Sequence, residues 1–157
     1  VMTPLHHLRF GIVGGGLLHD DIFVETICDG VHLCPEMIRL IFKVKGCDRI
    51  MLITDSMRAA GMPDGDYTLG GLPVVVRDGC ARLTTGQVAG STLCYHEGLR
   101  RVRDLTGLPL AELIKTTSYN QAVSLGIRDI GKLEYGYRAD LVLLDAETLV
   151  PWKTFVG

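Results

Sequence analysis

The strand–helix–strand pattern of residues 22–54 constrains the fold of this chain more than any other feature. Residues 22–28 have the composition of a β-strand, and residues 48–54 form a second apolar run that ends abruptly. Between them, Pro35 stands where a first helical turn accepts proline, and apolar residues then recur at helical spacing up to Gly46. This pattern predicts two parallel strands joined by a right-handed crossover, as in an α/β fold.

Polar residues follow both predicted strands. Asp29 and His32 come after the first strand, and Asp55 ends the second. Because the carboxyl ends of parallel strands lie at one edge of a sheet, where α/β folds carry their chemistry, we expect these three residues to converge. An isolated Asp at such a place can equally be a cap or turn residue, and an isolated His is more often a packed one.

The chain changes character after residue 60. Residues 61–90 are rich in glycine and contain three short β-like runs, 67–69, 72–76 and 80–83, with Asp78 and Gly79 predicting a hairpin turn. Two helices are expected next, at 96–105 and 110–125, each followed by a glycine. From Gly131 the pattern returns to β-structure, at 132–135 and again at 139–145, and residues 154–157 also have strand composition.

The composition is that of a globular chain. Its 157 residues are 47% hydrophobic and 22% charged, enough to bury a core. A formal net charge of -2 gives no reason to expect nucleic acid or an anionic membrane as partner, and no apolar run approaches the roughly 20 residues of a spanning helix. The five cysteines are odd in number without a C-x-x-C pair, which argues against a disulfide framework and favours a reducing cytoplasm.

Several segments, in order along the chain, carry a resemblance to a known family. They are residues 2–7, the D-G-x-H segment within 27–32, the T-D-S-M segment that opens 54–65, the A-G-S-T-L segment within 88–93, and the tail 131–145. Together they resemble the N-acetylglucosamine-6-phosphate deacetylases of the amidohydrolase superfamily. The resemblance covers essentially the whole chain; the tail alone is shared widely, whereas the three middle segments are more specific.

The resemblance implies a fold and a division of the chain. The fold would be an α/β (β/α)8 barrel of the TIM type with a small β-sandwich. Residues 1–128 would form the C-terminal portion of the barrel, with a β-hairpin insertion and terminal helices, and residues 129–157 part of the sandwich. The strands at 22–28 and 48–54 would be the seventh and eighth of the barrel. The chain would therefore be a C-terminal fragment, inactive alone, with the metal-binding Glu and two His of the family lying before Val1.

The implied activity is hydrolysis of the acetamide of N-acetylglucosamine 6-phosphate to glucosamine 6-phosphate and acetate. Asp55 would be the catalytic acid and base, which takes a proton from the attacking water and gives it to the leaving amine. A divalent metal ion, zinc or similar, would be the cofactor of the complete enzyme, expected to be a cytoplasmic homodimer. Seven residues would contact the substrate: Asp29, Gly30, Val31, His32, Val88, Ala89 and Gly90.

One departure from the family pattern bears on the substrate. Leu8 stands where the family has an arginine that binds the substrate phosphate, and leucine offers no charged donor. The local backbone shifts, or phosphate affinity is reduced, or the sequence carries a local error. His6 and His7 are expected behind the site or on its substrate side. Two alternatives stay open: an amidohydrolase acting on another N-acyl amino sugar or a cyclic amide, and a truncated, non-catalytic homologue.

Overall fold

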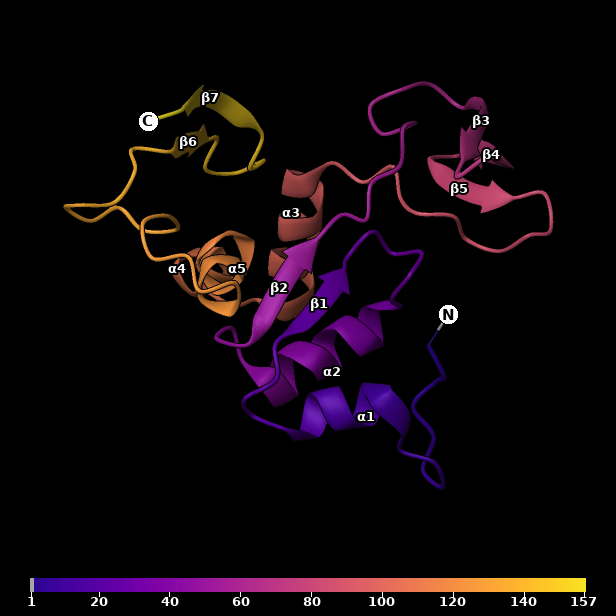
Figure 1. The fold of residues 1–157 in the computed structure, drawn as a ribbon, viewed down its shortest axis with the longest axis horizontal. Coiled ribbons are helices and arrows are strands. Elements are labelled where there is room, and N and C mark those ends of the chain that lie inside the picture. Colours follow the sequence, from indigo (N-terminus) through magenta and orange to yellow (C-terminus); the bar gives the residue numbers. More distant parts are fainter. Residues whose placement is uncertain (1) are drawn as a thin grey trace.

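The structure, a computed structural model, describes residues 2–157, and its strands form three separate small sheets (Figure 1). The elements in chain order are α1 (Gly11–Leu18), β1 (Val24–Ile27), α2 (Pro35–Lys45), β2 (Ile50–Ile53), β3 (Gly65–Leu69), β4 (Leu72–Arg77), β5 (Cys80–Leu83), α3 (Tyr95–Thr106), α4 (Leu110–Leu113), the 3-10 helix η1 (Ile114–Thr117), α5 (Tyr119–Ser124), β6 (Leu141–Leu144) and β7 (Pro151–Phe155). The β1–β2 pair lies at the centre, with the β3–β5 sheet and the β6–β7 hairpin apart from it.

The predicted strand–helix–strand unit is confirmed. β1 and β2 pair in parallel, and α2 connects them. Pro35 occupies the first turn of α2, and Gly46 ends the helix with a φ of 63°, a conformation that glycine adopts without steric cost. The inner face of α2 buries Ile38 and Phe42, as its apolar spacing predicts.

The main core joins this unit to the helices that follow. Its fully buried members include Ile50 of β2, Val102 of α3 and Leu113 of α4. Leu149, which precedes β7, is also fully buried in this core and so ties the C-terminal hairpin to the rest of the chain. Among residues 2–157, no helix combines the length and the apolar character that crossing a membrane requires.

The β3–β5 sheet has a core of its own and a turn of the predicted kind. Asp78 and Gly79 both have positive φ angles, 51° and 68°, as a two-residue hairpin turn of type I′ requires. The carboxylate of Asp64 accepts hydrogen bonds from the backbone N–H groups of both turn residues. Val74 and Val76 of β4 are buried on one face of this sheet.

The single helix predicted for residues 110–125 is wrong. The chain instead forms α4, η1 and α5, with a break at Ser118. The hydroxyls of Thr116 and Thr117 donate to the carbonyl oxygens three residues earlier, at 2.7 and 2.8 Å, and such local bonds compete with a regular helix. The break lets Asn120 turn its side chain onto the strand–helix unit, where its amide donates to the carbonyls of Cys47 and Ile50.

Two further segments differ from prediction. Residues 132–135 form no strand: no strand of residues 2–157 pairs with them, and Leu133 and Tyr135 are exposed. The helix α1 was not expected, since its three consecutive glycines disfavour helix. There the ring of Phe10 packs so close to Gly14 that a Cβ on this glycine would lie 2.5 Å from it.

Candidate active site

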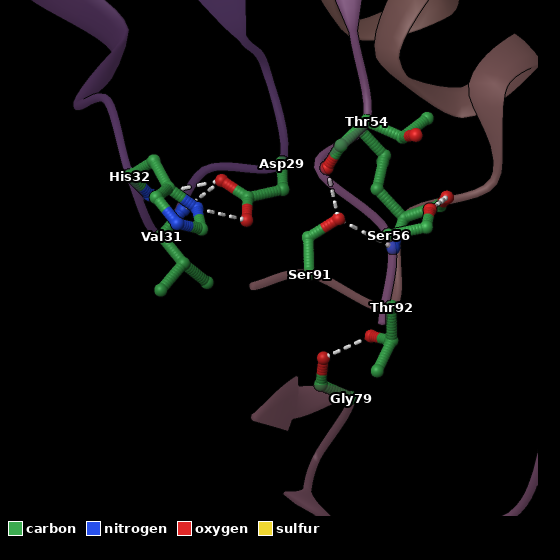
Figure 2. A network of polar contacts seen from close by, with 9 residues as sticks. Asp29, Val31, His32, Thr54, Ser56, Gly79, Ser91 and Thr92 are labelled. Carbon is green, nitrogen blue, oxygen red and sulfur yellow. Dashed lines mark hydrogen bonds and ion pairs between the residues drawn. The ribbon is translucent and has the colours of Figure 1, made fainter. Parts of the chain in front are cut away.

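The register of the β1–β2 pair places the carboxyl ends of both strands at the same edge of the sheet. Ile27 of β1 lies opposite Ile53 of β2, so Asp29 and Asp55 each follow two residues beyond this last pair. The segments that continue from the two strands appear together in Figure 2. The parallel arrangement on which the expected convergence depends is therefore present.

Asp29 and His32 form a tight turn (Figure 2). One oxygen of the Asp29 carboxylate accepts the backbone N–H groups of Val31 and His32, each at 2.8 Å, and the other lies 2.7 Å from Nδ1 of His32. Burial alone would raise the pKa of Asp29, but the hydrogen bonds from His32 and Val31 outweigh it and hold the pKa below 3.8. An ionised carboxylate only accepts, so Nδ1 of His32 carries a proton, and in the neutral form of the ring Nε2 is the acceptor.

The backbone conformation of Gly30 favours glycine in this turn. Its φ of 83° lies where side chains are disfavoured, and a Cβ there would stand 2.7 Å from Nη1 of Arg101 on α3, a flexible side-chain end that would have to move. Val31 contributes its backbone N–H to the turn, while its side chain stays 40% exposed. The turn at 29–32 thus presents the His32 ring on a backbone that the Asp29 carboxylate and the positive φ of Gly30 shape.

Asp55 has an unusual backbone and an unengaged side chain. Its φ of 51° is uncommon for a residue other than glycine and occurs most often in Asp and Asn. The residue is exposed, and within the described part of the chain its carboxylate has no hydrogen-bond partner. An exposed carboxylate at the carboxyl end of a parallel strand, where α/β folds bind ligands, is available to a ligand.

The segment at 88–93 runs alongside the residues around Asp55. Ser56 and Ser91 form an isolated parallel bridge. The backbone N–H of Ser91 donates to the Asp55 carbonyl at 2.8 Å, and that of Met57 donates to the Ser91 carbonyl at 2.9 Å. Figure 2 shows the Ser91 hydroxyl bonded to the carbonyl oxygen of Thr54.

The three residues expected to contact substrate at 88–90 have different surroundings. Gly90 lies directly on Asp55: its φ is 67°, and a Cβ there would come within 3.0 Å of the Asp55 carbonyl oxygen. Val88 forms a bridge with Arg82, and the backbone N–H of buried Ala89 donates to Ala81. Val88 and Ala89 therefore join the β3–β5 sheet to the site, and Gly90 makes the close approach.

The N-terminal turn, residues 6–9, lies outside the group of site residues at 29–32, 55 and 88–91. The rings of His6 and His7 stack with their centroids 4.5 Å apart, and Nδ1 of His6 accepts the backbone N–H of Leu8. Leu8 is 78% exposed, so it provides no buried packing in place of the missing arginine. Among residues 2–157, no hydrogen bond joins this turn to Asp29 or Asp55.

The described residues do not by themselves make a metal centre. Within residues 2–157, no group of three or more His, Cys, Asp or Glu side chains gathers closely enough to hold an ion. Asp55 and His32 are single donors at the ends of two different strands. A metal-dependent reaction would need further ligands in addition to them.

Ser91 is the residue that the sequence did not single out. It stands inside the A-G-S-T-L segment, yet that segment alone is most simply a turn followed by a helix cap. Its contacts with Thr54, Asp55 and Met57 reach residues more than 30 positions earlier, and no local spacing indicates them.

Comparison with known proteins gives the class to which this arrangement belongs. The sequence matches the Amidohydrolase family over residues 16–157, and the chain belongs to that family. It is 44% identical over 149 residues to the N-acetylglucosamine-6-phosphate deacetylase of Lysinibacillus sphaericus, covering 95% of this chain and 38% of that protein. It is also 43% identical to the N-acetylgalactosamine-6-phosphate deacetylase of Escherichia coli O157:H7, covering 92% of this chain and 38% of the relative.

A solved structure gives the same answer for the fold. The N-acetylglucosamine-6-phosphate deacetylase of Thermotoga maritima superimposes with a TM-score of 0.93 at 49% identity, over 98% of this chain and 42% of that one. The predicted fold, part of a TIM-type barrel with part of a small β domain, is confirmed by this likeness. The chain spans about two fifths of the length of these relatives.

Proposed function

We propose that this chain supplies the proton-transfer residue and part of the sugar-binding surface of an enzyme that deacetylates N-acetylglucosamine 6-phosphate. The observation that carries the proposal is Asp55, a carboxylate without a partner among the described residues, at the carboxyl end of β2. Relatives named N-acetylglucosamine-6-phosphate deacetylase match nearly the whole chain. The 29–32 turn, at the adjoining strand end, supplies the group that would bind the sugar.

Amide hydrolysis gives Asp55 two tasks. It would take a proton from the water that attacks the acetamide carbonyl carbon, and give that proton to the nitrogen as the C–N bond breaks. The products are acetate and the free amine. The carboxylate must reach both the water and the nitrogen, each within about 3 Å, which demands a fixed strand end. Nε2 of His32 would accept a hydrogen bond from a polar group of the sugar phosphate.

Further features of the complete protein belong to the same proposal. A divalent metal ion, zinc or similar, would be held by ligands from outside residues 2–157. Residues 1–128 would belong to the barrel and residues 129–157 to the small β domain. We place the protein in the cytoplasm, supported by five cysteines that are all free. A homodimer stays a prediction, which light scattering on the complete gene product would test.

A second candidate substrate is the C4 epimer, N-acetylgalactosamine 6-phosphate. The relative named for that sugar is 43% identical to this chain, against 44% for the first glucosamine enzyme, so overall similarity does not separate the two. Exposed Leu8 also leaves open an amino sugar without the phosphate. Discrimination between epimers depends on hydrogen bonds to a single hydroxyl, which the site must pair or leave unpaired.

The test is an assay of acetate release by the complete gene product, supplied with zinc. N-acetylglucosamine 6-phosphate, its C4 epimer and unphosphorylated N-acetylglucosamine are compared by kcat/KM. The proposal predicts the highest value for the first sugar. A higher value for the epimer would support the second candidate, a higher value for the unphosphorylated sugar would show that the site does not need the phosphate, and no release from any of them would favour a non-catalytic homologue.

A further inference from the structure

Ser91 binds the backbone on both sides of Asp55. It is 3% exposed, and its hydroxyl donates to the carbonyl oxygen of Thr54 while accepting the backbone N–H of Leu93. Its own backbone N–H donates to the carbonyl oxygen of Asp55 at 2.8 Å, and its carbonyl accepts the backbone N–H of Met57 at 2.9 Å. One buried residue therefore bonds to three consecutive peptide groups around the candidate acid and base, those that join residues 54 to 57.

These contacts fix the two torsion angles of Asp55. The Thr54 carbonyl belongs to the peptide plane before the Asp55 Cα, and the Asp55 carbonyl to the plane after it. Because Ser91 holds both oxygens, it sets both φ and ψ of Asp55, and with them the direction of the Cα–Cβ bond. A φ of 51° persists in a residue other than glycine only where the surroundings impose it.

We propose that Ser91 is a positioning residue that aims the Asp55 carboxylate at the reacting atoms. This rests on the proposed function, because it gives Asp55 a task that depends on direction. A group that moves a proton between two atoms is sensitive to small displacements, whereas substrate binding through the 29–32 turn does not pass through Ser91.

The chain offers a matched control one residue away. The hydroxyl of Thr92 donates to the carbonyl of Gly79 in the β4–β5 turn, so it too bonds a distant backbone carbonyl, but not one next to Asp55 (Figure 2). Ser91→Ala removes the hydroxyl that holds the plane before Asp55. Thr92→Val removes a hydroxyl of the same kind and keeps the shape of the side chain.

The experiment measures kcat and KM for deacetylation by the complete gene product, together with crystal structures of the variants. For Ser91→Ala we expect kcat to fall about 10- to 100-fold with KM changed less than about twofold, and Asp55 to leave its left-handed conformation. Thr92→Val should keep kcat near that of the wild type. If Ser91→Ala does not fold, Ser91→Cys, which keeps the size but donates weakly, is judged by the same criteria.

Three results would overturn the inference. They are an unchanged kcat in Ser91→Ala, a rise in KM alone, and an Asp55 φ that stays near its original value. If the wild type itself hydrolyses none of the acetylated sugars, the proposed function fails first. The crystal structure then decides whether Ser91 fixes the Asp55 backbone, independently of activity.

Discussion

Nδ1 of His32 lies 2.7 Å from a carboxylate oxygen of Asp29, three residues earlier in the same turn. The other oxygen of that carboxylate is occupied by two backbone N–H groups, so Asp29 is fully engaged in shaping the turn and orienting the ring. Asp55, at the equivalent place beyond β2, has no such engagement among the described residues. The two carboxylates at this edge thus have different roles, one in orienting a histidine and one open to a ligand.

The first prediction concerns the tautomer of His32. In Asp29→Asn, the side-chain oxygen can still accept the two backbone N–H groups, but the amide would donate to Nδ1 and move the ring proton to Nε2. Nitrogen-15 NMR of histidine-labelled protein should show Nδ1 protonated in the wild type and Nε2 protonated in the variant. His32→Gln assigns the signals, and an unchanged tautomer in Asp29→Asn would refute the orienting role.

The second prediction is the pH dependence of stability. Hydrogen bonds hold the pKa of Asp29 in the folded protein below its ordinary 3.8. The ionised carboxylate therefore stabilises the folded state fully above that value, and the contribution disappears as the pH falls through the folded pKa. The difference in melting temperature between wild type and Asp29→Asn should be largest near neutral pH and shrink below pH 3.8. A difference that grows on acidification would contradict this.

The third prediction separates backbone strain from close packing at Gly90. Gly61 has a similar positive φ of 76° but open space where a Cβ would go, whereas a Cβ at Gly90 would meet the Asp55 carbonyl. Gly61→Ala should lower the free energy of unfolding by about 1–2 kcal/mol. Gly90→Ala should cost about 1–3 kcal/mol more, because the Asp55 backbone must move. Urea denaturation measures both, and equal losses would show that the close approach has no energetic importance.

The fourth prediction concerns the buried side chain that stabilises the start of β2. The Asn120 amide is 2% exposed and donates to the carbonyls of Cys47 and Ile50 at 2.6 and 2.7 Å. Asn120→Ala leaves both carbonyls without this donor and should cost about 2–4 kcal/mol. Thr117→Ala, which removes a hydroxyl bonded only to its own helical turn, should cost about 0.5–1 kcal/mol. Comparable losses in urea denaturation would argue against this role of Asn120.

Local sequence patterns predicted those parts of the fold that local interactions determine. The β1–α2–β2 unit has proline at the helix start, glycine at its end and a continuous apolar face, and all three signals predict the same helix. The hairpin turn at Asp78 and Gly79 is equally local. The break at Ser118 was not predicted, because the gain from it is the distant contact of Asn120 with β2.

The candidate site also has one part that local interactions determine and one part that contacts between distant residues determine. The 29–32 turn is formed by residues within four positions of one another, so its pattern is visible in the sequence. The contacts that hold the Asp55 backbone join residues 54–57 to Gly90 and Ser91 through backbone groups and the Ser91 hydroxyl, and their partners are too far apart in the sequence for any local pattern to indicate them. Helix α1 escaped prediction because glycine disfavours helix, and of its glycines only Gly14 lies against the Phe10 ring.

The most direct test of the account is the rate of acetate release from N-acetylglucosamine 6-phosphate by Asp55→Asn in the complete gene product. Asp66→Asn is the matched control, since Asp66 is an exposed carboxylate on β3. We predict that Asp55→Asn lowers kcat about 10²- to 10⁴-fold, the contribution of a general acid and base, while Asp66→Asn behaves as the wild type. An Asp55→Asn variant as fast as the wild type would contradict the assignment of Asp55 as the proton-transfer residue.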